Sequence, residues 1–233
     1  MTTTRTRIKI CGLTREQDVD AAVAAGTDAV GFVFYPKSAR YVSAARAAEL
    51  ARRLPPLVTP VLLFVNADAN EVLAASAAVP GATLQFHGDE AAAQCADLAA
   101  RSGRPYWRAA RIPVEGSESF NLVKFAHTFS SAQALLLDAL VEGFGGGGKT
   151  FDWSRLPTNI PAHLVLSGGL TPANVAAAIA RVRGRGLSLA VDVSSGVEAD
   201  GPGGQTLKGI KDAAKILQFV AAVRAADTQS SLP

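Results

Sequence analysis

RIKICGLTREQDVDAAVAAGTDAVGFVF, residues 7–34, holds two short aliphatic runs with an Ala-rich segment between them. The runs Arg7–Cys11 and Ala29–Phe34 have the length and composition of buried strands. The segment Arg15–Ala25 between them has the period of a helix and a high helix propensity. A strand, a helix and a second strand in this order form the unit from which parallel sheets are built. The stretch therefore predicts an α/β protein.

The same alternation continues along the chain. Further strands are predicted at Val58–Val65, Thr83–Phe86, Tyr106–Arg111, Ala134–Asp138, His163–Ser167 and Leu189–Val193, and further helices at Ala44–Leu54, Ala69–Val79, Glu90–Arg101, Pro172–Arg183 and Gly209–Ala226. Thr14, Ser43 and Thr171 stand where helix N-caps are expected. The ends of the eight predicted strands are 21 to 31 positions apart, about the length of one strand–helix unit.

Eight such units in 233 residues favour a single-domain (β/α)8 TIM barrel over an open doubly wound sheet. We assign the barrel to residues 1–226 and expect residues 227–233 to be a disordered C-terminal tail. With 48% hydrophobic and 18% charged residues, the composition is that of a packed domain and not of a disordered chain.

Composition also restricts the setting and the partners. The net charge of +3 comes without a basic patch bearing interleaved aromatic residues, so no nucleic-acid partner is expected. The sequence has no apolar run of about 18 residues and no secretory signal pattern, which excludes a membrane partner and export. Two cysteines, Cys11 and Cys95, cannot build a disulfide framework, so we expect a cytoplasmic protein. The oligomeric state, monomer or homodimer, stays open.

Active sites of such barrels lie at the carboxyl ends of the strands. Cys11 ends the first predicted strand, and Asp138 ends the apolar strand Ala134–Asp138. The first and sixth strands lie across the barrel from each other, so a thiol and a carboxyl group would flank one small substrate. That pair suits the removal of one proton and the donation of another. The alternative is that Cys11 is a small buried hydrophobe and Asp138 a structural, hydrogen-bonded carboxylate.

Two Gly-rich loops follow the seventh and eighth predicted strands, at residues 167–172 and 192–196. Barrels commonly bind a phosphate group there through backbone N–H groups. The loops therefore predict a phosphorylated small-molecule substrate, although glycines that serve only tight turns are the alternative.

Other motifs favour different chemistry. Gly143–Thr150 matches the P-loop pattern, including Lys149, but the following Phe151–Pro157 is a poor helix, which disfavours a nucleotide hydrolase. Lys9 could support a Schiff-base aldolase. His87 has no second ligand at metal spacing, so no metal site is predicted. A barrel that binds a phosphorylated ligand without converting it also remains open.

Eight motifs in order resemble one family. They are KICGLT (9–14), GFVFYPKSARYV (31–42), FVN (64–66), QFHGDE (85–90), LLD (136–138), GKTFDW (148–153), LSGGL (166–170) and DVSSGV (192–197). Over residues 7–223 the chain is similar to the phosphoribosylanthranilate isomerases of tryptophan biosynthesis. Phe86, where Leu is expected, and a longer segment at residues 198–207 depart from the family pattern.

The resemblance implies an Amadori rearrangement of N-(5-phosphoribosyl)anthranilate to 1-(2-carboxyphenylamino)-1-deoxyribulose 5-phosphate, with no cofactor and no metal. It implies that Asp138 protonates the furanose ring oxygen and that Cys11, as a thiolate, takes the proton from C2. The implied substrate-binding residues are Arg40 at the anthranilate carboxylate, His87 and Arg111 at the mouth, Gly168, Gly169, Ser194 and Ser195 at the phosphate, and Asp192.

Overall fold

Eight parallel strands of the described chain pair in sequence order and close into a barrel, with β1 hydrogen-bonded to both β2 and β8. The strands are β1 (Arg7–Cys11), β2 (Ala29–Val33), β3 (Thr59–Phe64), β4 (Thr83–Phe86), β5 (Tyr106–Pro113), β6 (Ala134–Leu140), β7 (His163–Leu166) and β8 (Ser188–Val193). This computed structural model describes residues 5–114, 120–140 and 150–229. The predicted strands and the barrel are confirmed.

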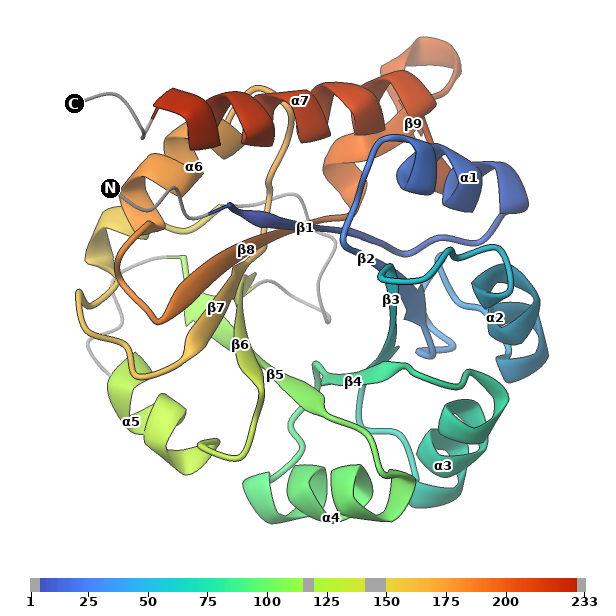
Figure 1. Ribbon diagram of the computed structural model, residues 1–233, viewed down its shortest axis with the longest axis vertical. Helices are drawn as coiled ribbons and strands as arrows, with labels where there is room; N and C mark the ends of the chain where they lie inside the picture. The colour runs from blue at the N-terminus through green and yellow to red at the C-terminus, as the bar shows by residue number, and fades with distance from the viewer. Residues whose placement is uncertain (1–4, 115–119, 141–149, 230–233) are drawn as a thin grey trace.

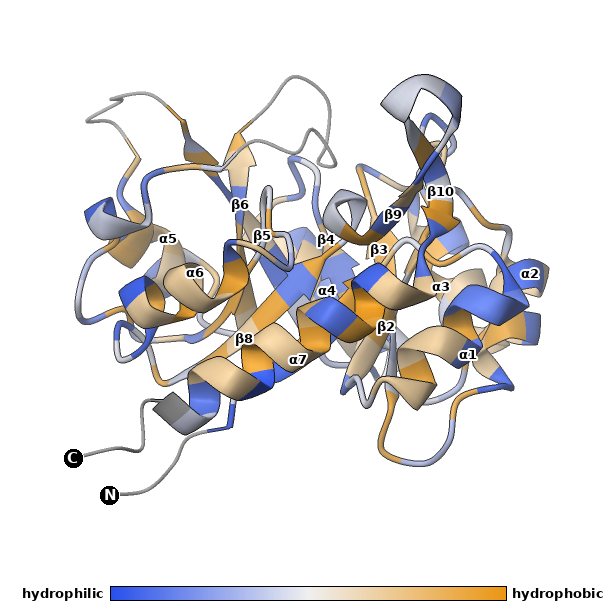
Figure 2. Ribbon diagram, turned by 90° about the horizontal axis from the view of Figure 1, so that it is seen from above, coloured by the Kyte–Doolittle hydropathy of each residue, from blue (hydrophilic) through white to orange (hydrophobic). Residues whose placement is uncertain are grey.

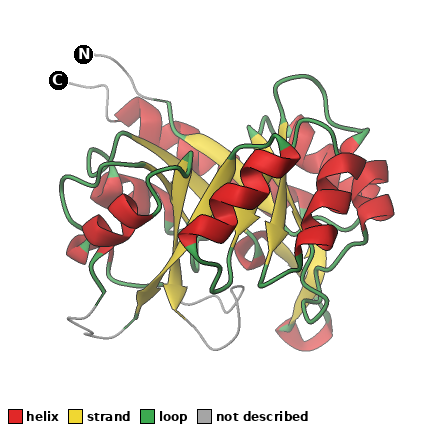
Figure 3. Ribbon diagram, turned by 90° about the horizontal axis from the view of Figure 1, so that it is seen from below, coloured by secondary structure: helices red, strands yellow, loops and turns green. Residues whose placement is uncertain are grey.

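Helices form an outer layer around the strands (Figures 1 and 3). They are α1 (Glu16–Ala24), α2 (Ala44–Ala51), α3 (Ala69–Ala78), α4 (Ala92–Ser102), α5 (Leu122–Thr128), α6 (Val175–Val182) and α7 (Ala213–Gln229), with short 3₁₀ turns η1 (Trp153–Arg155), η2 (Ser195–Val197) and η3 (Pro202–Gly204). A two-stranded antiparallel sheet of β9 (Glu198–Asp200) and β10 (Thr206–Lys211) follows the barrel. It projects from the same side as the carboxyl end of β6 (Figure 2).

Alternation along the strands divides the core into two parts. Outward residues such as Ile8, Ile10 and Leu62 are buried with apolar residues of the helices. Inward residues form the separate barrel interior, where Ala109, Leu136 and Val165 lie at one level of the register and Ala134 lies one level nearer the amino-terminal end. Because successive side chains point to opposite faces of a strand, the next inward residue toward the carboxyl end reaches the rim of the barrel.

Phe86 belongs to the outward part of the core. Its ring lies 6.3 Å from that of Phe64 and 5.8 Å from that of Tyr106, and Phe64 in turn stacks on Phe34 at 5.2 Å. Four aromatic rings on neighbouring strands thus pack in one row beneath the helices. The departure from the family pattern at Phe86 therefore changes the helix-facing core and not the barrel interior.

The predicted helix starts were only partly right. Ser43 caps α2 by accepting a hydrogen bond from the Arg46 N–H. Thr14 is not a cap, because its hydroxyl donates to the Gly209 carbonyl at 2.7 Å. The predicted helix at Pro172 starts three residues later, after Asn174, whose side chain accepts from the Thr171 N–H at 2.8 Å and so stabilises a turn before α6.

The predicted C-terminal tail begins too early. Helix α7 continues to Gln229, and the Asp227 carboxylate accepts hydrogen bonds from the Thr6 N–H at 2.9 Å and the Thr6 hydroxyl at 2.6 Å. Arg183 donates to the same carboxylate at 2.6 Å. These bonds join the end of the last helix to the chain just before β1, so order extends past Asp227. Residues 230–233 of the expected tail lie outside the described residues.

No helix that the structure describes is both long enough and apolar enough to cross a membrane.

Candidate active site

Lys9 and Asp192 form a buried ion pair inside the barrel. They are register partners on β1 and β8, and the Lys9 ammonium donates to Asp192 Oδ1 at 2.8 Å. The Ser167 hydroxyl donates to the other carboxylate oxygen at 3.2 Å. Burial opposes the charge of Lys9, but Asp192 and Cys11 outweigh it and raise the pKa of the lysine. A Schiff-base role requires an uncharged amine, so this ion pair argues against the aldolase alternative.

Cys11 follows Lys9 by two residues on β1, so it points to the same side of the strand and lies closer to the rim of the barrel. It is 4% exposed and packs with Val33, Leu63 and Val65. Burial raises the pKa of the Cys11 thiol, whereas the positive charge of Lys9 opposes that shift. Lys9 therefore favours the thiolate most strongly, and Lys211 acts in the same direction.

Gly31 gives these two side chains their space. It is the register partner of Cys11 on β2, and a Cβ there would lie 2.7 Å from Cys11 Sγ and 3.2 Å from Lys9 Cε. Any larger residue would displace the thiol.

Asp138 is held by two hydrogen bonds at the carboxyl end of the barrel. The residue is 6% exposed. Its Oδ1 accepts the Ala139 N–H at 3.0 Å, and its Oδ2 lies 3.0 Å from His87 Nε2. The second ring nitrogen of His87 lies 3.0 Å from the amide nitrogen of Gln85. His87, expected to line the mouth, therefore contacts the carboxyl group directly.

The first predicted phosphate loop comes close to Asp138. Gly168 and Gly169 follow β7 with φ angles of 81° and 63°, a region that favours glycine. A Cβ at Gly168 would lie 2.8 Å from both Asp138 Oδ1 and the Ala139 nitrogen. The glycine is therefore required both by its backbone conformation and by the close approach of this loop to the carboxyl group.

The second predicted phosphate loop contacts β10. Ser194 and Ser195 follow β8 and lead into η2. The Lys211 ammonium donates to the Ser194 carbonyl oxygen at 2.9 Å and to its hydroxyl at 3.3 Å. The segment at residues 198–207, which departs in length from the family pattern, thus forms most of a hairpin whose last residue holds this loop.

Arg40 is engaged by Glu198 of that hairpin. Its Nε and Nη2 donate to the two carboxylate oxygens at 2.7 and 2.8 Å, and Lys211 lies 3.2 Å from Glu198 Oε1. Burial opposes ionisation of Glu198, but these two cations hold its pKa below the usual range. A Cβ at Gly12 would meet Arg40 Cδ at 2.6 Å, so Arg40 lies directly against the residue that follows Cys11.

Arg111 lies farther out than the other expected residues. It is the register partner of Asp138 on β5, and its Nη2 donates to Asp89 Oδ1 at 2.6 Å. A quarter of its side chain is exposed, so the residue belongs to the rim of the barrel and not to its interior.

Three residues of this arrangement do not stand at the end of a predicted strand. Gln85 lies inside β4, and its even spacing from His87 was the available signal, because alternate residues share a face. Glu198 and Lys211 lie on β9 and β10, whose pairing joins residues outside the repeated unit. No local pattern predicted that pairing.

The P-loop alternative loses its structural context. Residues 143–149 lie outside the described residues. In the described residues 150–162, the regular structure is the three-residue turn η1, where a P-loop requires a long helix. Among the described residues, no group of three or more His, Cys, Asp or Glu side chains is arranged to hold a metal ion.

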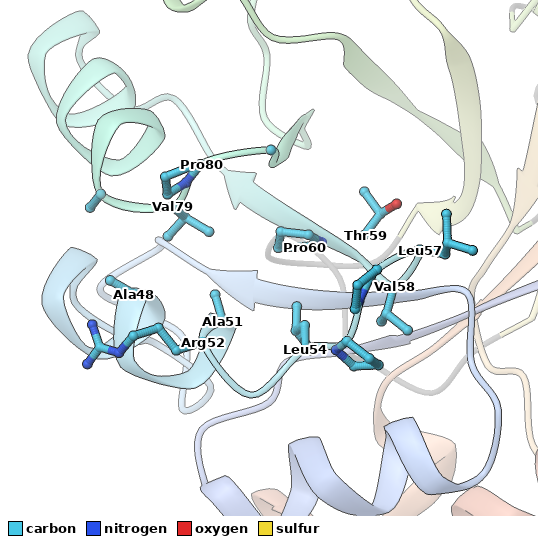
Figure 4. Close-up of a pocket in the computed structure, with 14 residues that line it drawn as sticks. Ala48, Ala51, Arg52, Leu54, Leu57, Val58, Thr59, Pro60, Val79 and Pro80 are labelled. Carbon is cyan, nitrogen blue, oxygen red and sulfur yellow. The ribbon is translucent and has the colours of Figure 1, made fainter.

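A hollow of about 690 Å³ lies away from these residues (Figure 4). The end of α2 and the segments that lead into β3 and β4 form it, with Leu54, Val58, Pro60 and Val79 among its lining residues. It therefore belongs to the amino-terminal end of the barrel, and Arg52 is its one charged lining residue.

Comparisons with known proteins identify the family and the fold. The family model of N-(5'phosphoribosyl)anthranilate (PRA) isomerase matches residues 8–222. N-(5'-phosphoribosyl)anthranilate isomerase of Methylibium petroleiphilum is 61% identical over 225 residues, 97% of each chain. The crystal structure of phosphoribosyl anthranilate isomerase from Thermotoga maritima has a TM-score of 0.80 and 38% identity, covering 94% of this chain and 99% of that one.

A second solved structure is that of a phosphoribosyl anthranilate isomerase in complex with reduced 1-(o-carboxyphenylamino)-1-deoxyribulose 5-phosphate. It has a TM-score of 0.75 and 36% identity, and it covers 94% of this chain and 99% of its own. The family model and the nearly full-length relatives confirm the resemblance found in the sequence. This chain belongs to the phosphoribosylanthranilate isomerases, the family that acts in tryptophan biosynthesis.

Proposed function

We propose that this isomerase catalyses the Amadori rearrangement of N-(5-phosphoribosyl)anthranilate with Asp138 as the general acid and Cys11 as the general base. The observation that carries the proposal is the placement of the two groups. Cys11 ends β1 and Asp138 lies near the end of β6, and the two strands are separated by β7 and β8 in the closed barrel. Both are buried and point inward at the same rim.

The acid step opens the sugar ring. Asp138 gives its proton to the furanose ring oxygen, the bond between that oxygen and C1 breaks, and the nitrogen lone pair forms an iminium with C1. The carboxyl group is fixed for this by His87 and by the Ala139 N–H. A fixed donor of this kind contributes about 10²–10⁴-fold to a rate.

The base step moves the double bond. The Cys11 thiolate takes the proton from C2, which converts the iminium to an enolamine, and the enolamine then tautomerises to the ketone. The Lys9 ammonium favours the thiolate that this step needs. One proton leaves Asp138 and one arrives at Cys11, so the pair must exchange a proton with solvent before the next turnover.

The substrate has two charged ends, a phosphate and an anthranilate carboxylate, and different residues would bind each of them. Gly168, Gly169, Ser194 and Ser195 would bind the phosphate through backbone N–H groups, beside Asp192. Arg40 would meet the anthranilate carboxylate, and His87 and Arg111 would line the mouth. The related complex with a reduced deoxyribulose 5-phosphate supports a phosphorylated ligand in this fold.

The setting of the protein is also a proposal. Both cysteines are free and buried, as expected for a thiol-dependent enzyme of the cytoplasm. One solved structure concerns monomers derived from the dimeric isomerase of Thermotoga maritima. For this chain the oligomeric state, monomer or homodimer, stays open.

Paired variants test the mechanism. We expect Cys11→Ala and Asp138→Asn each to lower kcat by about 10²–10⁴-fold, because each removes one proton-transfer group. The exposed Asp97→Asn serves as a control and should leave kcat unchanged, since its carboxylate pairs with Arg101 on the outer helix α4. Wild-type turnover in either site variant would eliminate the assigned roles.

A further inference from the structure

Gln85 is connected to the proposed acid through one imidazole ring. The side chain is completely buried on β4, two residues before His87. Its amide nitrogen lies 3.0 Å from His87 Nδ1, and His87 Nε2 lies 3.0 Å from Asp138 Oδ2. The three side chains form a continuous hydrogen-bonded row from β4 to β6.

The direction of these hydrogen bonds determines where the protons are. A neutral imidazole carries one N–H, so one ring nitrogen donates while the other accepts. With the Gln85 amide N–H donating to Nδ1, the ring proton is on Nε2 and is donated to Asp138. The other carboxylate oxygen accepts the Ala139 N–H. In this arrangement Asp138 is a carboxylate and has no proton to deliver.

One added proton produces the arrangement that the acid step needs. If the Gln85 carbonyl faces the ring, it accepts a hydrogen bond from Nδ1–H, and Nε2 then accepts one from a protonated Asp138. The His87–Asp138 pair holds one proton more than before, taken from solvent. Delivery of that proton to the substrate returns the pair to its earlier proton count.

The carbonyl oxygen of Gln85 supports such a reversal. Within the described residues it is buried without a hydrogen-bond partner. Rotation of the amide group by half a turn therefore breaks no hydrogen bond of the carbonyl oxygen. A buried carbonyl left in this state costs about 1–3 kcal/mol. An apolar side chain would fill the same interior position without that cost, so packing alone does not account for an amide here.

We propose that Gln85 is a positioning residue that sets the tautomer of His87 and thereby lets Asp138 hold the proton it delivers. The inference rests on the proposed acid role of Asp138. Gln85 acts through His87 and does not touch the reacting atoms.

Kinetics give the first test. Gln85→Met keeps the length of the side chain but cannot form the hydrogen bond. We expect kcat for N-(5-phosphoribosyl)anthranilate to fall about 10- to 100-fold, part of the contribution of the acid itself, with KM little changed. Gln133→Met is the matched control, because Gln133 is exposed and bonds Trp107 outside the row. Wild-type kcat in Gln85→Met overturns the proposal.

Imidazole ¹⁵N NMR reports the tautomer of His87 directly, and a purely structural role of Gln85 would not change that tautomer. The chain has three histidines, so the His87 signals are assignable by comparison with His87→Asn. We expect the wild-type protein at about pH 8 to carry its ring proton on Nε2, and Gln85→Glu, whose carboxylate can only accept, to carry it on Nδ1. An unchanged tautomer in Gln85→Glu overturns the proposal even if Gln85→Met fails to fold.

The two proposals fail in different ways. A wild-type protein without turnover contradicts the proposed function, whereas the NMR measurement requires no substrate. Turnover in the wild type together with an unchanged kcat and tautomer in the Gln85 variants contradicts the positioning role alone.

Discussion

At the scale of single residues, the site depends on charges that are buried in pairs. Lys9 pairs with Asp192 inside the barrel and Arg40 pairs with Glu198 nearer its mouth, with nitrogen–oxygen distances of 2.8 and 2.7 Å. Removal of one partner of such a pair lowers the free energy of unfolding by about 3–5 kcal/mol, because the other charge remains buried without its partner. Each pair therefore keeps both of its charges in place near Cys11, where solvent does not screen them.

The Lys9 charge predicts the pH dependence of the base. Burial raises the pKa of Cys11 and Lys9 opposes this shift, so removing Lys9 should raise the pKa further. Because the thiolate is the active form, kcat/KM should rise with pH, and this rise should occur at higher pH in Lys9→Met. The measurement is the pH profile of kcat/KM for both proteins, with folding checked by circular dichroism.

The double variant Lys9→Met/Asp192→Asn is the companion measurement, because it removes the whole ion pair and leaves no buried charge unpaired. The effect of Lys9 on the thiol exceeds that of Asp192, so the rise should still occur above the wild-type pH. Coincident profiles for wild type and Lys9→Met would show that the lysine does not act on the base.

Some of these residues could be predicted from the sequence and others could not. Cys11 and Asp138 stand at strand ends, where the strand period alone places them at the rim. Asp192 was found in the same way, but its role in holding Lys9 depends on a partner 183 positions away. Gln85 lies inside β4 and not at its end, so the rule of strand ends passed over it, although its spacing of two from His87 places both side chains on one face.

At the scale of elements, the β9–β10 hairpin changes the expected picture of the phosphate region. The sequence showed a Gly-rich segment of unusual length, whose pairing could not be seen because its strands are short and outside the repeat. In the structure Glu198 and Lys211 at the base of the hairpin hold Arg40 and Ser194. The hairpin therefore connects the predicted carboxylate and phosphate contacts.

Glu198→Gln should loosen this connection in a pH-dependent way. The pKa of Glu198 is lowered in the folded protein from an ordinary value of 4.5, so its stabilising effect is present above that value and is lost as pH falls through the folded pKa. We expect the variant to be less stable by about 3–5 kcal/mol at neutral pH, with a smaller difference in acid. Urea unfolding at several pH values measures this; an equal difference throughout would contradict it.

The end of α7 contributes to stability where a disordered tail was expected. Asp227→Ala removes hydrogen bonds from Thr6 and Arg183, and bonds to charged groups are worth about 1.5–3 kcal/mol. We expect the free energy of unfolding to fall by at least about 2 kcal/mol. Thr228→Ala is the control, since that exposed hydroxyl bonds only carbonyls of its own helix. Equal stability of the two variants would show that α7 is not anchored by Asp227.

At the scale of the whole molecule, closure of the barrel turns separate strand ends into one site. The spacing of eight apolar runs was enough to predict the barrel and its rim, because each unit needs about the same length of chain. The spacing could not predict which side chains meet across the rim. Lys9 meets Asp192 because the barrel closes between β1 and β8, and His87 reaches Asp138 over the intervening strand β5.

Turnover by the purified wild-type protein tests most directly whether this chain isomerises N-(5-phosphoribosyl)anthranilate. Freshly prepared N-(5-phosphoribosyl)anthranilate is mixed with the protein, and the loss of anthranilate-type fluorescence is followed with time. We predict a loss whose rate is proportional to protein concentration and is abolished in the Cys11→Ala/Asp138→Asn double variant. A rate equal to that of the uncatalysed reaction, with the wild-type protein folded, would contradict it.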